Sequence, residues 1–367
     1  MRIVIEKRQA LSRTALILTP IISFFVSLLL GALLLMASRV NPLETYAAMV
    51  RGAFGTWSNF TETLVKAIPL MLTGLGVSIA FRMRFWNIGA EGQLVCGGIA
   101  AAWVALFWTF VPEGLLLPTA LLVGALAGAL WAGVPAALKA YIKVDETLTT
   151  LMLNYVAILY SQYLYYGPWR DPQGYGFPGS ALLPAMAWLP RLTGRVHYGV
   201  FFAVVVAFVL WFVFTRTRWG FELRIIGENQ TAARYLGINI ARNIVLALLL
   251  SGALSGLAGA AEVTGLSRRL QQGLAVGYGY TAIIVAWMAQ LNPLAVLVVA
   301  VLMAALLVGG DQVQMMMRLP AAVGLVLQGM ILFPMLAGAL FVEYRLRIIR
   351  PQAVDLEPTP TAPEVTP

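Results

Sequence analysis

The sequence contains few of the residues on which catalysis and metal binding depend. Its 367 residues include one cysteine, Cys96, and one histidine, His197. A single cysteine excludes an intrachain disulfide and a cysteine-rich metal site, and a lone histidine in a connecting loop provides neither a histidine-pair zinc site nor a histidine-dependent triad. None of the four lysines follows a glycine, which excludes a GxxxxGK[ST] phosphate loop. We therefore expect no catalytic residue, metal or cofactor in this chain.

Charged residues are also scarce. They make up 11% of the chain, and hydrophobic residues make up 60%, whereas soluble domains carry about 25% charged residues. The mean hydropathy is +0.82. These values exclude a soluble globular protein, and apolar runs of roughly 20 residues match about 30 Å of hydrocarbon. The net charge of +9 comes from Lys and Arg at the ends of apolar runs, which indicates orientation in a membrane and not a nucleic-acid partner.

The pattern predicts an all-α polytopic membrane protein with about ten transmembrane helices in one transmembrane domain over residues 14–345. A short apolar run at 279–291, followed by Asn292 and Pro293, predicts that one helix is short or broken. Stripes of small residues, such as Gly124 with Gly128 and Gly252 with Gly256, predict close helix packing. The expected spans are 14–37, 62–81, 87–111, 115–138, 147–166, 198–215, 243–263, 279–291, 294–309 and 320–341.

The distribution of basic residues predicts the orientation. With residues 1–13 on the cytoplasmic side, sixteen of the 25 Lys and Arg residues fall in cytoplasmic segments, as the positive-inside rule requires. Both termini are then cytoplasmic. The segment 346–367 is rich in proline and acidic residues, and it has too little apolar content to fold alone. We expect it to be a disordered cytoplasmic tail.

Polar residues gather where the second span ends and the third begins, in FRMRFWNIGAEGQL at 81–94. Asn87, Glu91 and Gln93 lie beside glycines, a pattern typical of a bent helix start with free backbone amides. The alternative is a capped helix start buried among neighbours. Two other carboxylates lie in or beside spans, Glu262 and Asp311, and an ionisable group at membrane depth suggests a functional site. For Asp311 we favour a helix end bonded to backbone amides or water.

Two loops are long enough to bind partners. The cytoplasmic loop 216–242 contains GENQTAARYLGIN at 227–239, which predicts a short helix with a small face that ends at Gly237. Such a helix buries little against its own domain, so docking to a soluble partner is favoured over an ordinary interfacial helix. The outer loop 167–197 is rich in Pro, Gly and Trp, and it either contacts an extracytoplasmic partner or covers the helix ends.

The sequence resembles the permease subunits of ABC importers of the branched-chain amino acid and simple sugar group, within it the nucleoside-type branch. The resemblance covers nearly the whole chain. It rests on FRMRFWNIGAEGQ at 81–93, GENQTAARYLGIN at 227–239, LSGALSGLAGAAEVTG at 250–265 and GYGYTAIIVAWMAQLNPL at 277–294.

The resemblance implies a set of partners in a bacterial-type plasma membrane. They are a cytoplasmic ABC ATPase that uses the ATP, a second permease subunit on a different chain, and an extracytoplasmic solute-binding lipoprotein, with lipid around the helices. The segment 227–239 matches the loop that such permeases insert into the ATPase, although Thr231 replaces the usual glutamate. The residues expected to couple to the ATPase are Gly227, Asn229, Ala232, Ala233, Arg234 and Gly237.

The resemblance also implies that the chain translocates a nucleoside-type solute and does no chemistry. The residues expected in the pathway are Asn87, Glu91, Gln93, Asn154 and Glu262. Three alternatives stay open. One is a permease for simple sugars, another is a secondary transporter in which Glu91 or Glu262 couples a proton to the solute, and the third is an intramembrane enzyme that uses carboxylates.

Overall fold

The structure is a computed structural model. It describes residues 2–7, 13–317, 326, 329–330, 333–334, 337–338 and 344–349. The chain divides into two compact units. The first comprises Met1–Leu30 and Ile331–Pro367, and the second comprises Gly31–Met330.

The first unit contains a two-stranded antiparallel sheet of β1, Arg2–Lys7, and β4, Tyr344–Ile349. Arg2 pairs with Ile349, and Lys7 pairs with Tyr344. The expectation that the tail is disordered from residue 346 is wrong for residues 346–349. The alternating RIVIEK and YRLRII segments are β-formers that pair across more than 300 residues, which no local pattern indicates. Residues 350–367 lie outside the described residues.

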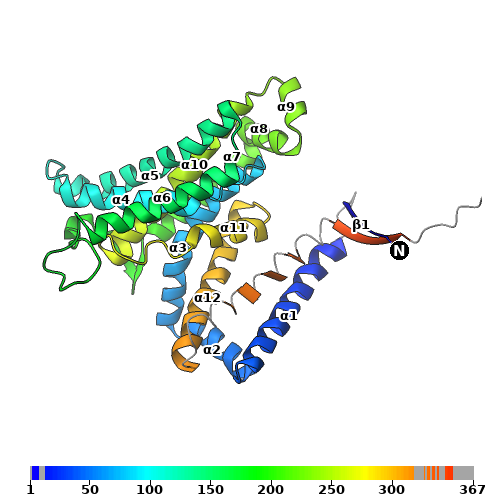
Figure 1. Cartoon of the computed structure of the whole chain (residues 1–367), viewed down its shortest axis with the longest axis horizontal. Helices are drawn as coiled ribbons and strands as arrows, with labels where there is room; N and C mark the ends of the chain where they lie inside the picture. The colour runs from blue at the N-terminus through cyan, green and yellow to red at the C-terminus, as the bar shows by residue number, and fades with distance from the viewer. Residues whose placement is uncertain are drawn as a thin grey trace, which may run out of the picture. The chain divides into compact units, whose positions relative to one another are not determined.

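The second unit is a bundle of helices, and its longest connection is the loop between α6 and α7 (Figure 1). Its first helix, α1, begins in the first unit. The bounds of the helices are α1 Arg13–Ala37, α2 Pro42–Phe54, α3 Trp57–Arg82, α4 Ala90–Phe107, α5 Glu113–Ala137, α6 Glu146–Tyr166, α7 Gly199–Arg216, α8 Arg218–Glu228, α9 Gln230–Tyr235, α10 Ile240–Ala261, α11 Tyr278–Met288 and α12 Pro293–Met317.

Among the described residues, six helices are long and apolar enough to cross a membrane, or seven if the bent pair of α1 and α2 counts as one span. Nine of the ten expected spans overlap a helix, but α6 is not apolar enough to be counted. The short helix expected near 279–291 is confirmed, because α11 has eleven residues. The last expected span, 320–341, lies almost wholly outside the described residues.

Sequence analysis missed α2. Its start carries a strong signal: the Asn41 side chain accepts a hydrogen bond from the Leu43 amide at 3.0 Å, and Pro42 occupies the first helical position. Asn before Pro is a favoured helix start. The helix has thirteen residues, too few to cross a bilayer, so a search for long apolar runs does not detect it.

The core of the second unit forms where α4, α5 and α10 pack against one another, and α3 packs on α10 (Figure 1). The predicted small-residue stripes face each other there. A Cβ added at Gly97 would lie 2.1 Å from the Gly256 carbonyl oxygen, and one at Gly128 would lie 2.3 Å from the Gly252 oxygen. Only glycine allows backbones this close, and such contacts replace the hydrophobic effect in lipid.

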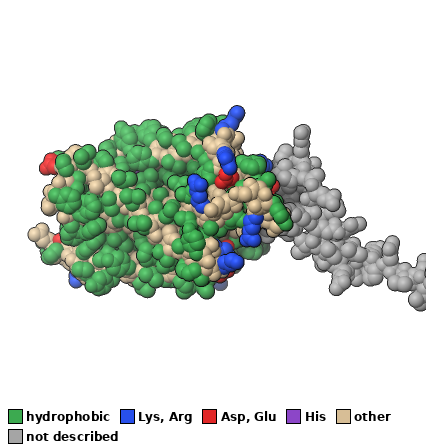
Figure 2. All heavy atoms as spheres, turned by 90° about the horizontal axis from the view of Figure 1, so that it is seen from above, with side chains coloured by type: hydrophobic (Ala, Val, Ile, Leu, Met, Phe, Trp, Pro, Cys, Tyr) green, Lys and Arg blue, Asp and Glu red, His purple; other side chains and the backbone are tan. Residues whose placement is uncertain are grey.

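The face of the molecule in Figure 2 is largely hydrophobic, and its Lys and Arg side chains gather toward one end. Large apolar side chains are exposed along α5 and α7, among them Leu122, Leu126, Val205 and Phe208. In water such a surface would aggregate, whereas in a bilayer it contacts lipid.

Candidate functional site

Glu91 in the first turn of α4 binds the start of α11. Its Oε1 accepts a hydrogen bond from the Gly277 amide at 2.8 Å, and its Oε2 accepts one from the Gly279 amide at 2.5 Å. Gly277 has φ +89° and no side chain with which to cap α11, so the carboxylate of Glu91 takes over that role. An anion at the positive end of a helix is also favoured by the helix dipole.

Asn87, in the link between α3 and α4, and Gln93, in the first turn of α4, form a closed hydrogen-bonded pair. Asn87 Oδ1 accepts from Gln93 Nε2 at 3.1 Å and from the Gly89 amide at 3.1 Å, and Asn87 Nδ2 donates to Ser251 Oγ of α10 at 3.0 Å. Asn87 and Gln93 are buried. Buried amides are tolerated only when paired in this way.

Asn154 ties α6 to the same place. Its Oδ1 accepts from the Gly92 amide at 2.8 Å, and its Nδ2 donates to the Ile88 carbonyl at 2.8 Å and to the Tyr280 hydroxyl at 3.2 Å. Four of the five residues predicted for the pathway therefore come together at the start of α4. Their polar groups bind protein atoms, so a solute reaches them only if α6 or α11 moves.

Glu262 is separate from this cluster. It follows α10 at the start of a π-helical turn, Glu262–Ser267, is buried, and its Oε2 has no hydrogen-bond partner among the described residues. The positive charges of Arg195 and Lys66 are close enough to act on it. Glu262 thus belongs to a second group of ionisable residues.

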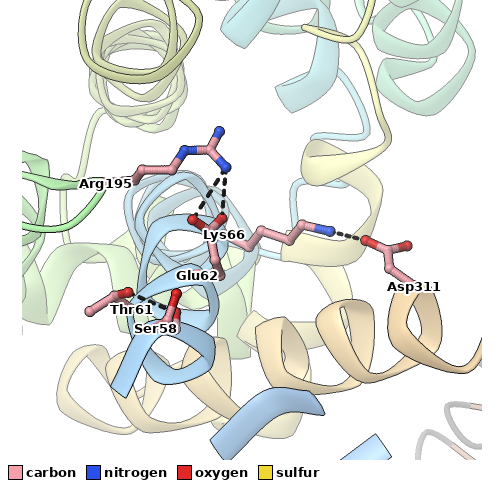
Figure 3. Close-up of polar contacts among 6 residues, drawn as sticks. All are labelled: Ser58, Thr61, Glu62, Lys66, Arg195 and Asp311. Atoms are coloured by element: carbon pink, nitrogen blue, oxygen red, sulfur yellow. Dashed lines mark hydrogen bonds and ion pairs between the residues drawn. The ribbon is translucent and has the colours of Figure 1, made fainter. Parts of the chain in front are cut away.

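That second group was largely missed from the sequence. Lys66 of α3 forms an ion pair with Asp311 of α12, and Arg195 Nη1 lies 3.0 Å from Glu62 Oε2 (Figure 3). The expectation that Asp311 is bonded at a helix end is wrong, because its partner is a lysine 245 residues away in sequence. The signal that could have found the group is Lys66 itself, the one lysine inside an apolar run.

The segment expected to couple to an ATPase forms two short helices, α8 and α9. Asn229 caps α9, because its Oδ1 accepts from the Thr231 amide at 2.9 Å and the Ala232 amide at 3.1 Å. The predicted stop at Gly237 is confirmed: α9 ends at Tyr235, and Gly237 has φ +73°. Left-handed glycine after a helix is a common terminator.

The small face predicted for this segment points partly inward. Ala233 is fully buried, and a Cβ at Gly227 would lie 2.0 Å from the Arg82 carbonyl oxygen at the end of α3. Gly227 is therefore in backbone contact with the end of α3, and Ala233 is covered by this chain's own residues. Their contact with an ATPase stays a prediction. Arg234 is exposed, and the most prominent side chains are Tyr235, 89% exposed, and Leu236, 62% exposed.

Loop 167–197 covers the end of the bundle and is bound to the segment after α10. The Ser180 amide donates to the Leu270 carbonyl at 2.8 Å, the Leu183 amide to the Arg268 carbonyl at 2.8 Å, and the Leu189 amide to the Thr264 carbonyl at 3.1 Å.

His197 ends this loop as a buried residue. Its Nδ1 accepts from the Gly199 amide at 3.2 Å, and burial together with the charge of Arg191 lowers the pKa of His197 to about 4. In the part of the chain that the structure describes, no three His, Cys, Asp or Glu side chains are grouped so that they could hold a metal ion.

Comparison with known proteins gives one family. The family model for the branched-chain amino acid transport system permease component matches residues 59–336. The glucose ABC transporter permease protein of Haloferax volcanii is 35% identical over 342 residues, 90% of this chain and 90% of that protein.

Two bacterial relatives are named for other solutes. The guanosine ABC transporter permease protein of Bacillus subtilis is 35% identical, with 81% of this chain and 86% of that protein covered. The nucleoside ABC transporter permease protein of Lactococcus lactis is 29% identical, with 81% and 85% covered.

Proposed function

Because this chain belongs to the family of branched-chain amino acid transport system permease components, we propose that it is the membrane subunit of an ATP-driven importer of nucleosides. The main support for this proposal is that the chain is similar, over most of its length, to permeases named for guanosine and nucleosides. A simple sugar is the second candidate solute, since the glucose permease relative is 35% identical over 90% of this chain.

Under this proposal, a separate cytoplasmic ATPase hydrolyses the ATP, and helices α8 and α9 of this chain contact that ATPase. The buried residues Gly227 and Ala233 attach this segment rigidly to α3 and the bundle. The exposed Tyr235 and Leu236 at its end provide an apolar surface for a partner. Movement of the ATPase would then be transmitted as a rigid-body movement of the helices.

The remaining subunits follow from the same proposal. A second permease on another chain completes the path across a plasma membrane, and an extracytoplasmic lipoprotein delivers the solute. The distribution of the basic residues supports an orientation with both termini in the cytoplasm. Loop 167–197, bound to the segment after α10, then lies on the side from which the lipoprotein approaches.

The test is purification of the tagged chain from its native membrane, followed by uptake measurements on the reconstituted complex. We expect an ATPase, a second permease and a binding protein to co-purify, and labelled nucleoside to enter only when ATP is present. Uptake of labelled nucleoside but not of labelled glucose supports the nucleoside, and the reverse result supports the sugar. Uptake by this chain alone without ATP, driven by a proton gradient, would contradict the proposal.

A further inference from the structure

The charged group of α3 and α12 lies on an open surface. The Lys66 side chain is 29% exposed and that of Asp311 is 54% exposed. Beside them, Arg195 and Glu62 pair through Nη1 contacts of 3.2 and 3.0 Å. Figure 3 shows Glu62 and Lys66 projecting from neighbouring turns of α3, one toward Arg195 and the other toward Asp311. We call these four residues the ion-pair wall.

The position of the wall along the helices argues against contact with lipid. Lys66 is the tenth residue of α3, about 14 Å along its axis, and lies inside the expected span 62–81. An exposed ammonium group in contact with hydrocarbon there would be costly. Phe208, the tenth residue of α7, is exposed to 55% and shows the apolar type of side chain that faces lipid.

The chemistry of the wall fits the passage of a polar, uncharged molecule. Its two cations and two carboxylates compensate each other, so the surface attracts neither anions nor cations strongly. Lysine and arginine present donors, and carboxylates present acceptors, which suits the hydroxyl and amide groups of a nucleoside or a sugar. The buried carboxylate of Glu262 lies close enough to Lys66 and Arg195 to interact with them.

We propose that the ion-pair wall lines the water-filled solute path in the half of the bundle that carries loop 167–197. This inference rests on the proposed function, because it assigns the path of the same permease. It differs from the residues expected from the sequence: the cluster of Asn87, Glu91 and Gln93 is closed by internal hydrogen bonds, whereas the wall is open.

Cysteine labelling of the full complex in membrane vesicles tests the wall directly. Replacing the single cysteine by Cys96→Ala gives a chain without thiols, and labelling is then read on this chain alone after the subunits are separated. Lys66→Cys and Asp311→Cys are then compared with Phe208→Cys. Phe208 has an exposure similar to that of Asp311, and it is the tenth residue of α7 as Lys66 is the tenth of α3. Leu307→Cys, one turn before Asp311 on α12, leaves both ion pairs intact and serves if the charged variants do not assemble.

A water-soluble thiosulfonate reagent should modify the wall positions and Leu307→Cys at least about tenfold faster than Phe208→Cys, because thiolates form in water and not in lipid. Reagents of opposite charge add a second measurement. In Asp311→Cys the charge of Lys66 is uncompensated, so the new thiol should react faster with an anionic reagent. In Lys66→Cys the charge of Asp311 is uncompensated, so the new thiol should react faster with a cationic reagent. The ratio of the two rates should differ between these variants by roughly tenfold.

Labelling at the wall no faster than at Phe208→Cys would overturn the inference, because the surface would then be covered by lipid or by protein. This outcome is independent of the solute. If the wall is labelled but nucleoside uptake fails, only the proposed solute is contradicted. If uptake succeeds but the wall stays unlabelled, only the assignment of the wall to the solute path is contradicted.

Discussion

The carboxylate of Glu91 and the backbone amide of Gly279 are joined by a 2.5 Å hydrogen bond that ties the start of α4 to the first turn of α11. The two residues are also in backbone contact, since a Cβ at Gly279 would lie 2.2 Å from the Glu91 nitrogen. The start of α4 therefore holds a helix, α11, that begins almost 190 residues later in the chain. A carboxylate engaged on both oxygens acts first as a structural residue.

Glu91→Ala should destabilise the protein and reduce uptake in proportion. The variant leaves the Gly277 and Gly279 amides without their acceptor, at a cost of about 3 kcal/mol or more. Thermal unfolding of the purified complex, measured beside the amount assembled and the uptake per assembled complex, checks this. Glu91→Gln retains an acceptor oxygen and should recover part of the stability. Full assembly with lost uptake would instead assign Glu91 to the solute path.

Gly97→Val should disrupt the packing of α4 on α10. Its Cβ would lie within 2.3 Å of two backbone atoms of Gly256, which cannot move as a flexible side chain would, so we expect a loss of about 2–3 kcal/mol. Gly114→Ala is the control, because no atom lies within 4 Å of its Cβ and it should change stability by less than about 1 kcal/mol. Equal melting temperatures for both variants would argue against the glycine contact.

Tyr235→Asp should separate ATPase binding from folding. The side chain is 89% exposed, so the melting temperature should stay the same, while a charge at the apolar tip of α9 should reduce the ATPase recovered in a pull-down by about tenfold or more. Ala233→Leu is the matched variant inside the segment. Ala233 is fully buried, so this change should lower both stability and recovery. Normal ATPase recovery with Tyr235→Asp would rule out the tip as the contact.

Acidification should destabilise the loop that ends at His197. The pKa of this histidine is about 4 in the folded protein because of burial and then of Arg191, against about 6.5 when unfolded. The unfolded chain therefore binds more protons below pH 6.5, and stability falls as the pH drops from about 7 to 4, by up to about 3 kcal/mol. Melting temperatures between pH 4.5 and 7.5 should fall more steeply for the native protein than for His197→Phe, which removes the single histidine.

Much of the fold was predictable because it depends on local patterns. The length of the apolar runs located nine helices, the shortness of α11 followed from its interrupted run, and the stop of α9 followed from Gly237. The pairing of β1 with β4 was not predictable, because its register connects Arg2 to Ile349. The thirteen-residue α2 does have a local signal, but that signal is a helix cap and not an apolar run, so a search for apolar runs missed it.

The candidate site divides in the same way. The polar segment 81–94 could be identified as important from its residues, but whether Glu91 faces a solute or a helix start depends on which element lies opposite it. The ion pair of Lys66 with Asp311 shows the same limit, since its two members are 245 residues apart. Small residues in the segment 227–239 were visible in the sequence, yet only the structure shows that Gly227 lies against the Arg82 carbonyl of α3.

The sequence by itself determined that this protein is a helical membrane permease, because apolar run lengths and short motifs depend on residues that are neighbours in the chain. Only the tertiary structure decided which polar groups bond to other helices inside the protein and which lie on an open surface. The physical reason is that a buried hydrogen bond or ion pair requires two partners, and for Glu91, Lys66 and Asp311 the partner is supplied by a helix far away in the sequence.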